Sequence, residues 1–96
     1  MESNVFVALG YGREEAANLR IRARLIAAFR RHVQERGLTQ AEAAEIIGAS
    51  QPRISDLIGG KIDKFTIDFL VNALTSLGES VHLVLGGESA VDETDG

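Results

Sequence analysis

Cysteine is absent from the chain, which excludes disulfide bonds and thiolate metal sites. Long apolar runs are also absent, and the N-terminus lacks the basic-then-apolar pattern of a signal peptide. Proline occurs once, and nothing in the composition resembles a disordered chain, since 45% of the 96 residues are hydrophobic. We therefore expect a single folded domain in a soluble, cytoplasmic protein without a membrane partner.

The sequence gives little support for an enzymatic function. His32 and His82 lie far apart and have no flanking ligand pattern, so a metal site is not expected. Ser50 and Ser55 have no histidine-and-base pattern beside them, which argues against a nucleophile. We expect neither a cofactor nor an enzymatic activity.

Basic residues are missing from one end of the chain. Residues 65–96 carry six acids and no lysine or arginine, whereas residues 13–36 carry seven arginines and three glutamates. The net charge of −4 therefore hides a basic part and an acidic part. A binding surface depends on the local field and not on the total, so a nucleic-acid partner is not excluded.

The apolar spacing predicts four main helices. One extends over about 14–35, the next from a capping box at 39–42 to about Ile47, a third over 51–58 and a fourth over about 66–77. Ala43, Ala44, Ile46 and Ile47 are expected to face inward. At the two ends, residues 4–9 are expected to form a strand or an extended arm, and residues 80–85 a strand.

The single proline, Pro52, marks the start of the third of these helices. Proline in a helix interior costs roughly 3 kcal/mol, but the first turn tolerates it because its amides have no intrahelical partner. With Ser50 as the N-cap, Pro52 is the second helical residue. Its ring either serves helix initiation alone or also offers an apolar surface to a thymine methyl group, and both readings stay open.

Two short helices capped at Thr39 and Ser50 and joined through Gly48 predict a helix-turn-helix. The small side chains of Ala43 and Ala44 suit the close approach of the two helices, and Ile54 is expected to pack back into the core. Cap, glycine and apolar positions must share one register for this motif to form, which makes the pattern specific.

These residues, "TQAEAAEIIGASQPRISDLIGGK" at 39–61, resemble the helix-turn-helix of the XRE family, the lambda-repressor-like DNA-binding domains. The flanks, "NVFVALGYGREEAANLRIRARL" at 4–25 and "GKIDKFTIDFLVNALTSLGESVHLVL" at 60–85, resemble HigA-type antitoxins of type II toxin–antitoxin modules. The resemblance implies a mainly α, lambda-repressor-like bundle of four to five helices, to which we add a short C-terminal β-strand. It also implies a partner toxin, an RNase of the RelE-like kind.

The resemblance places the third helix in the DNA major groove, where residues near its N-terminus reach base edges first. Glutamine can bond adenine and arginine can bond guanine, each bidentately, while aspartate can accept from cytosine. In similar proteins the position of Gln40 contacts phosphate, which the free amides of a helix N-terminus favour. Lys61 and Lys64 suit phosphates, and Arg20 and Arg24 are candidates to add to that field. The predicted DNA-binding residues are Gln40, Ser50, Gln51, Pro52, Arg53, Ser55, Asp56, Lys61 and Lys64.

The expected organisation is an N-terminal arm at 1–13, a DNA-binding domain at 14–78, a dimerising strand at 79–86 and an acidic tail at 87–96. One short helix reads only a few base pairs, so a homodimer on a palindromic double-stranded operator is expected. The strand pairs either with residues 4–9 or with its own copy, and the second arrangement is favoured. A repressor and antitoxin is the first hypothesis. The alternatives are a stand-alone regulator and an interaction module that no longer binds DNA, which the net charge and the Gly59–Gly60 pair would permit.

Overall fold

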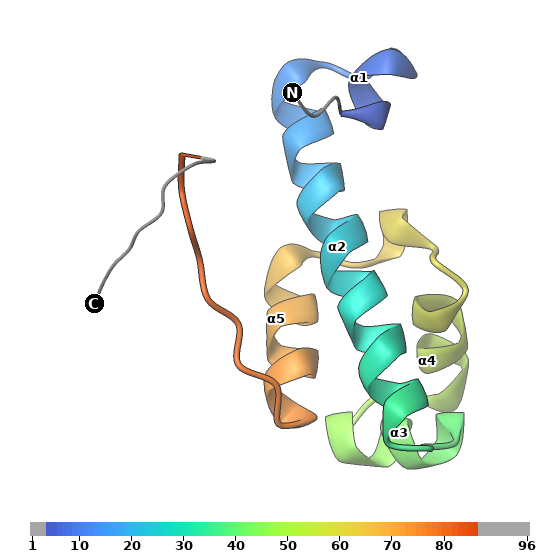
Figure 1. Ribbon diagram of the computed structural model, residues 1–96. Coiled ribbons are helices and arrows are strands. Elements are labelled where there is room, and N and C mark those ends of the chain that lie inside the picture. Colours follow the sequence, from blue (N-terminus) through green and yellow to red (C-terminus); the bar gives the residue numbers. More distant parts are fainter. Residues whose placement is uncertain (1–3, 87–96) are drawn as a thin grey trace.

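The computed structural model describes residues 4–86, and these form a mainly helical bundle (Figure 1). The long helix α2 runs the length of the molecule, with α5 along one side and α4 along the other, and α3 lies below them. The expectation of a mainly α bundle is therefore confirmed. In chain order the elements are α1 (Val5–Ala8), α2 (Arg13–Glu35), α3 (Gln40–Ile47), α4 (Gln51–Ile58), the 3-10 turn η1 (Ile62–Lys64) and α5 (Ile67–Ser76).

The core lies between the C-terminal half of α2 and the three helices packed around it. Phe29 of α2 is fully buried, as are Ile54 and Leu57 of α4, and Leu70 and Leu74 of α5 are 1% exposed. Each such side chain contributes roughly 1.5–3 kcal/mol by leaving water. The burial of Ile54 and Leu57 sets the rotation of α4 about its own axis, and so decides which of its residues face outward.

The core-facing side of α3 differs from the expectation at one position. Ala43 is fully buried and Ala44 is 6% exposed, but Ile46, expected to face inward, is 40% exposed. The buried side of α3 is centred midway between Ala43 and Ala44. At about 100° per residue, Ile46 is rotated by about 110° from that centre. The short helix can bury only one narrow side, and the alanines occupy it.

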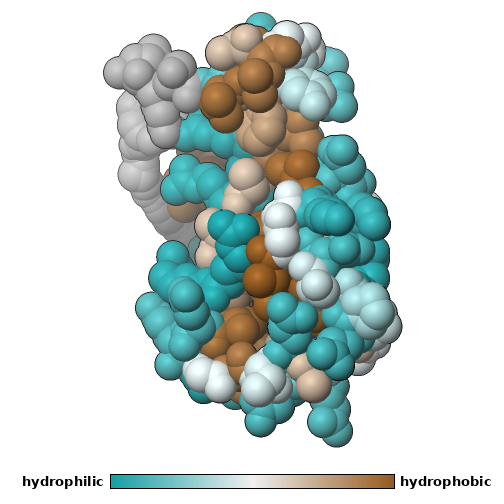
Figure 2. Space-filling model, turned by 90° about the vertical axis from the view of Figure 1, so that its right-hand side faces the viewer, coloured by the Kyte–Doolittle hydropathy of each residue, from teal (hydrophilic) through white to brown (hydrophobic). Residues whose placement is uncertain are grey.

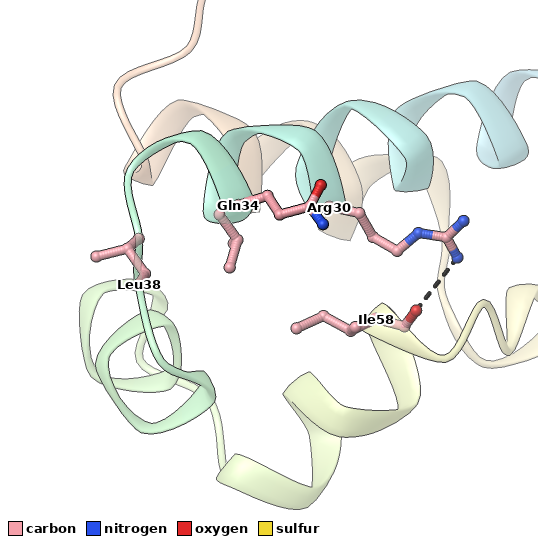
Figure 3. A pocket seen from close by; sticks show the side chains of 5 residues that line it. Arg30, Gln34, Leu38 and Ile58 are labelled. Atoms are coloured by element: carbon pink, nitrogen blue, oxygen red, sulfur yellow. Dashed lines mark hydrogen bonds between the residues drawn. The ribbon is translucent and has the colours of Figure 1, made fainter.

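Arg30 on α2 ties the end of α4 in place. Its Nη1 donates to the carbonyl oxygen of Ile58 at 3.2 Å, as Figure 3 shows. The two side chains border a hollow of about 400 Å³ that Val33, Gln34 and Leu38 complete. The bond satisfies a carbonyl at the C-terminal end of α4, where no amide of the same helix is available.

Arg22 and Arg36 hold two further segments in the same way. Arg22 Nη1 donates to the carbonyl oxygens of Ile62 at 3.0 Å and Phe65 at 3.2 Å, which fixes the segment around η1. Arg36 Nη1 donates at 2.6 Å to the carbonyl oxygen of Leu77, the C-cap residue of α5. Arginines of the basic helix are thus internal ties between distant parts of the chain.

The prediction of a strand or extended arm at residues 4–9 is wrong, because this segment forms the one-turn helix α1. Asn4 is the cause: its Oδ1 accepts from the amide of Phe6 at 2.8 Å, and its Nδ2 donates to the carbonyl oxygen of Ala16 at 3.0 Å. An N-cap joined to the next helix fixes a turn that a short apolar run does not reveal. Pairing of residues 80–85 with a strand at 4–9 is therefore excluded.

The expected strand at the C-terminal end is not confirmed. Among the described residues, 79–86 have no regular secondary structure and extend away from α5 (Figure 1). Leu83, Val84 and Leu85 are 82%, 66% and 79% exposed, respectively. The predicted acidic tail at 87–96 lies outside the described residues.

Candidate nucleic-acid interface

The helix-turn-helix is formed as its capping pattern predicts. Thr39 Oγ1 accepts from the amide of Glu42 at 3.0 Å, and Glu42 Oε1 accepts from the amide of Thr39 at 2.8 Å. Gly48 ends α3 in the left-handed conformation, at φ 79°. Three residues then separate α3 from α4, so the N-termini of both helices are fixed relative to each other.

The first turn of α4 begins at the predicted residue. Ser50 Oγ accepts from the amide of Arg53 at 3.2 Å, which makes Ser50 the N-cap and Pro52 the second helical residue. The ring of Pro52 therefore displaces no intrahelical hydrogen bond. Since the Ser50 hydroxyl already serves the helix, its predicted contact to DNA would use its remaining hydrogen-bonding capacity.

Four of the predicted DNA-binding residues come together in one shallow hollow. Gln40 at the start of α3 and Gln51, Pro52 and Ser55 of α4 line a depression of about 330 Å³. The last three side chains are exposed, and Gln40 is half-buried. Two amides and a hydroxyl thus converge beside one apolar ring, a mixture that suits both base edges and phosphate oxygens.

Arg53 lies outside this hollow, in a position that sequence reasoning did not anticipate. Its guanidinium carbon is 4.5 Å from the ring centroid of Phe65 and 4.8 Å from that of Phe69. The two rings are themselves 5.3 Å apart at an angle of 37°. Arg53 is half-buried on the side of α4 that faces η1 and α5. Phe65 and Phe69 are thus residues of the candidate interface that the sequence patterns missed, because both fall within apolar stretches.

Asp56 pairs with the two lysines that follow α4. Lys64 Nζ donates to Asp56 Oδ2 at 3.1 Å, and Lys61 Nζ lies 3.8 Å from Asp56 Oδ1. The hydrogen bond from Lys64 is the main cause that lowers the pKa of Asp56 below its usual 3.8, and the charges of Lys61 and Arg53 act in the same direction. Two lysines therefore contact this carboxylate, and Arg53 adds to the positive field around it.

Three arginines of α2 and its C-cap keep their charge, but hydrogen bonds within the fold hold them in place. Arg22, Arg30 and Arg36 donate to backbone carbonyls, as described above. Arg20 is half-buried and engaged within the fold. Arg24 is exposed and stays a candidate for long-range attraction of DNA.

Three further observations concern a histidine, metal-binding groups and membrane spans in the described residues. His32 Nδ1 lies 2.9 Å from Glu79 Oε1, which gives this histidine a partner in the fold. Residues 4–86 contain no cluster of three side chains suited to holding a metal ion. Among the described helices, none combines the length and the apolar character that a membrane span requires.

The fold and this site define a helix-turn-helix protein of the XRE type. A helix-turn-helix domain family matches residues 8–86, which is most of the chain, and the chain belongs to that family. A solved structure described as a provisionally assigned XRE family transcriptional regulator is similar at a TM-score of 0.71 and 26% identity. The match covers 83% of this chain and 94% of that one. No curated protein matches significantly.

Proposed function

We propose that the protein is a sequence-specific DNA-binding repressor that binds its own operator as a dimer. The observation that carries the proposal is the hollow in which Gln40 at the start of α3 meets Gln51, Pro52 and Ser55 of α4. Polar side chains in the first turns of two helices suit a polyanion that also displays base edges. The membership of a helix-turn-helix family and the likeness to an XRE regulator support the same function.

In this proposal the N-terminal end of α4 enters the major groove. The amide of Gln51 then pairs with an adenine edge, and Ser55 and the Pro52 ring complete the contact to neighbouring bases. Gln40 and the free amides of α3 bind a phosphate on one strand. Lys61 and Lys64 bind phosphates on the other side of α4.

The test is binding of the purified protein to the promoter upstream of its own gene, measured at several salt concentrations. Affinity should fall linearly with salt on a logarithmic scale as phosphate contacts release counterions. Gln51→Ala should cost about 1–3 kcal/mol on the operator and little on random DNA. Gln34→Ala, which removes the same side chain from an exposed position on α2, is the matched control. A wild-type protein without salt-dependent binding would instead favour the interaction module.

A dimer through residues 79–86 is part of the proposal. The exposed side chains of Leu83, Val84 and Leu85 would be covered if the segment paired with its copy across a two-fold axis. Analytical ultracentrifugation should show a dimer for the wild type and a monomer for Leu83→Asp/Leu85→Asp. The double variant should keep the helical circular dichroism of the wild type, because neither leucine belongs to the core. A dimer that survives the double substitution would move the interface elsewhere.

An antitoxin role is the second part of the proposal. It is supported by the resemblance of residues 4–25 and 60–85 to HigA-type antitoxins and by the acidic composition of residues 65–96. The apolar surface around α1, shown at the top of Figure 2, offers a second contact area for a toxin. Its exposed side chains are Val5, Val7, Leu9 and Tyr11.

The antitoxin role is tested with the adjacent reading frame. A neighbouring gene for a basic protein of similar size should arrest growth when expressed alone, and co-expression of this chain should restore growth. Continued arrest, or a gene without such a neighbour, would leave a stand-alone regulator as the function. Neither result depends on the DNA-binding measurement.

A further inference from the structure

We propose that Arg53 binds a DNA phosphate and not a base edge, and that Phe69, with Phe65, is the positioning residue for this contact. The inference rests on the proposed DNA-binding function and revises the expectation that Arg53 reads guanine. It divides the candidate interface into a base-reading part around Gln51 and a backbone-binding part around Arg53.

The first argument is the position of Arg53 around the helix. At about 100° per residue, Arg53 is rotated by only about 40° from the buried Leu57, whereas Gln51 lies on the other side, next to Ile54. Pro52 is therefore the outermost of these residues, and Ser55 and Asp56 lie on either side of it, each about 130° from the buried direction. A recognition helix in the major groove turns its outermost side to the bases and its two sides to the sugar–phosphate backbones. Arg53 lies on the side that carries the two phenylalanine rings, whereas Gln51 lines the hollow shared with Pro52.

The second argument is the set of charged side chains near Arg53. Lys61 and Lys64, the two lysines predicted to bind phosphate, meet at Asp56, one turn further along α4. Arg53 contributes to the field that lowers the pKa of Asp56, so all three cations share one region. A group of three cations suits the continuous charge of a DNA strand. In the hollow around Gln51 the lining groups are uncharged.

The third argument is the orientation that the two rings impose. With centroids 4.5 and 4.8 Å from the guanidinium carbon, Phe65 and Phe69 hold the group by cation–π attraction. Phe65 is 1% exposed and belongs to the core, so it is a rigid support. Within residues 4–86 the guanidinium donates no hydrogen bond, and its N–H groups are available for the planar, bidentate bonding of a phosphate. The ordering of a long side chain is complete before DNA binds.

Phe69 is the ring that can be tested. Unlike Phe65 it is half-buried, so Phe69→Leu keeps an apolar side chain at the edge of the core while it removes one aromatic partner of Arg53. Arg53→Ala removes the contact itself. Arg53→Lys keeps the positive charge but lacks the flat guanidinium. Arg13→Ala removes an exposed arginine at the first residue of α2 and is the matched control for the loss of one charge. That end of α2 lies far from α4 (Figure 1).

The experiment uses two probes: duplexes selected by the wild-type protein from a random-sequence library, and random duplexes of equal length. Arg53→Ala should weaken binding to both by a similar factor, about five- to tenfold near 0.1 M salt, and reduce the logarithmic salt slope by about 0.9. Its own selection should recover the wild-type sequence motif. Arg53→Lys should keep the slope, and Arg13→Ala should change neither property.

Phe69→Leu should weaken binding to both probes in the same direction as Arg53→Ala, and by less. Added to Arg53→Ala it should have no further effect, because a positioning residue acts only through the group it positions. Thermal unfolding of each variant checks that the fold is kept. If Phe69→Leu does not fold, the comparison of Arg53→Ala with Arg53→Lys still tests the phosphate contact.

Two results would overturn the inference. A changed motif for Arg53→Ala at one base pair would make Arg53 a base-reading residue. Unchanged affinity and salt slope would make the stacked arginine a part of the fold only. If the wild-type protein binds neither probe, the proposed function itself fails, which is a separate and recognisable result.

Discussion

Lys64 donates to Asp56 across 3.1 Å, so the carboxylate of α4 holds a lysine that would otherwise be available to DNA. Lys61 lies 3.8 Å from the same carboxylate. The side of α4 that faces η1 and α5 therefore carries its positive charge in a partly neutralised form. In our proposal, Asp56 therefore weakens the binding of DNA by this side of α4.

Asp56→Asn should consequently strengthen DNA binding. A single charge placed near phosphate contributes roughly 1 kcal/mol at the surface of a protein, which corresponds to about a fivefold gain in affinity at low salt. The gain should fade as salt is raised, because exposed charges are screened. Fluorescence anisotropy with the operator duplex measures both effects, and Glu14→Gln controls for the change in net charge. Equal affinity at low salt would place Asp56 away from the bound strand.

The ion pair of Asp56 also predicts a dependence of stability on pH. Its pKa is lowered in the folded state, mainly by the hydrogen bond from Lys64. Its contribution to the free energy of unfolding is therefore complete above the usual value of 3.8 and is lost as the pH falls through the lower folded value. Urea unfolding of the wild type and Asp56→Asn should show a gap that is constant near neutral pH and closes only in acid. A gap that closes near neutral pH would contradict the lowered pKa.

Gln40 and Gln51 line the same hollow but should behave differently. Gln51→Ala should lose about 1–3 kcal/mol on the operator and relax the preference at a defined base pair. Gln40→Ala should weaken binding to all sequences alike, because a phosphate contact carries no sequence information. Selection of duplexes from a random library separates the two. A motif altered by Gln40→Ala would give both residues a role in base reading.

Gly48→Ala should destabilise the turn between α3 and α4. No other atom would meet the added Cβ within 4 Å, so the cost is that of a left-handed backbone at φ 79°, about 1–2 kcal/mol. Gly48→Asn should cost less, because asparagine adopts this conformation more readily. Thermal unfolding at a fixed protein concentration checks the order glycine, asparagine, alanine. Equal stability of the alanine and asparagine variants would contradict a conformational origin.

The sequence was sufficient where the signal was local. The hydroxyls of Thr39 and Ser50 and the backbone freedom of Gly48 act within four residues, so the helices of the helix-turn-helix were predicted nearly to the residue. The four residues of the hollow followed from the same register. Residues 4–9 were misread because the cap of Asn4 depends on a bond to Ala16 in the next helix.

The remaining features depend on contacts between distant parts of the chain. Arg53 looked like a free reading residue because nothing in α4 indicates the rings of Phe65 and Phe69. The arginines of α2 looked like a surface patch because the carbonyls they bind lie far along the chain. The strand predicted at residues 80–85 is not seen in the single chain, because a strand needs a partner.

The hydrogen bonds from the arginines of α2 decide whether the helix-turn-helix can be transferred to another protein as a module. Arg30 donates to the last carbonyl of α4, and Arg22 donates to the carbonyls of Ile62 and Phe65. The ring of Phe65 in turn contacts the guanidinium of Arg53. A transplant of residues 39–61 into another scaffold would leave these ties behind. The recipient would acquire the DNA-contacting side chains without the elements that position them. The smallest transferable unit therefore extends from α2 to α5.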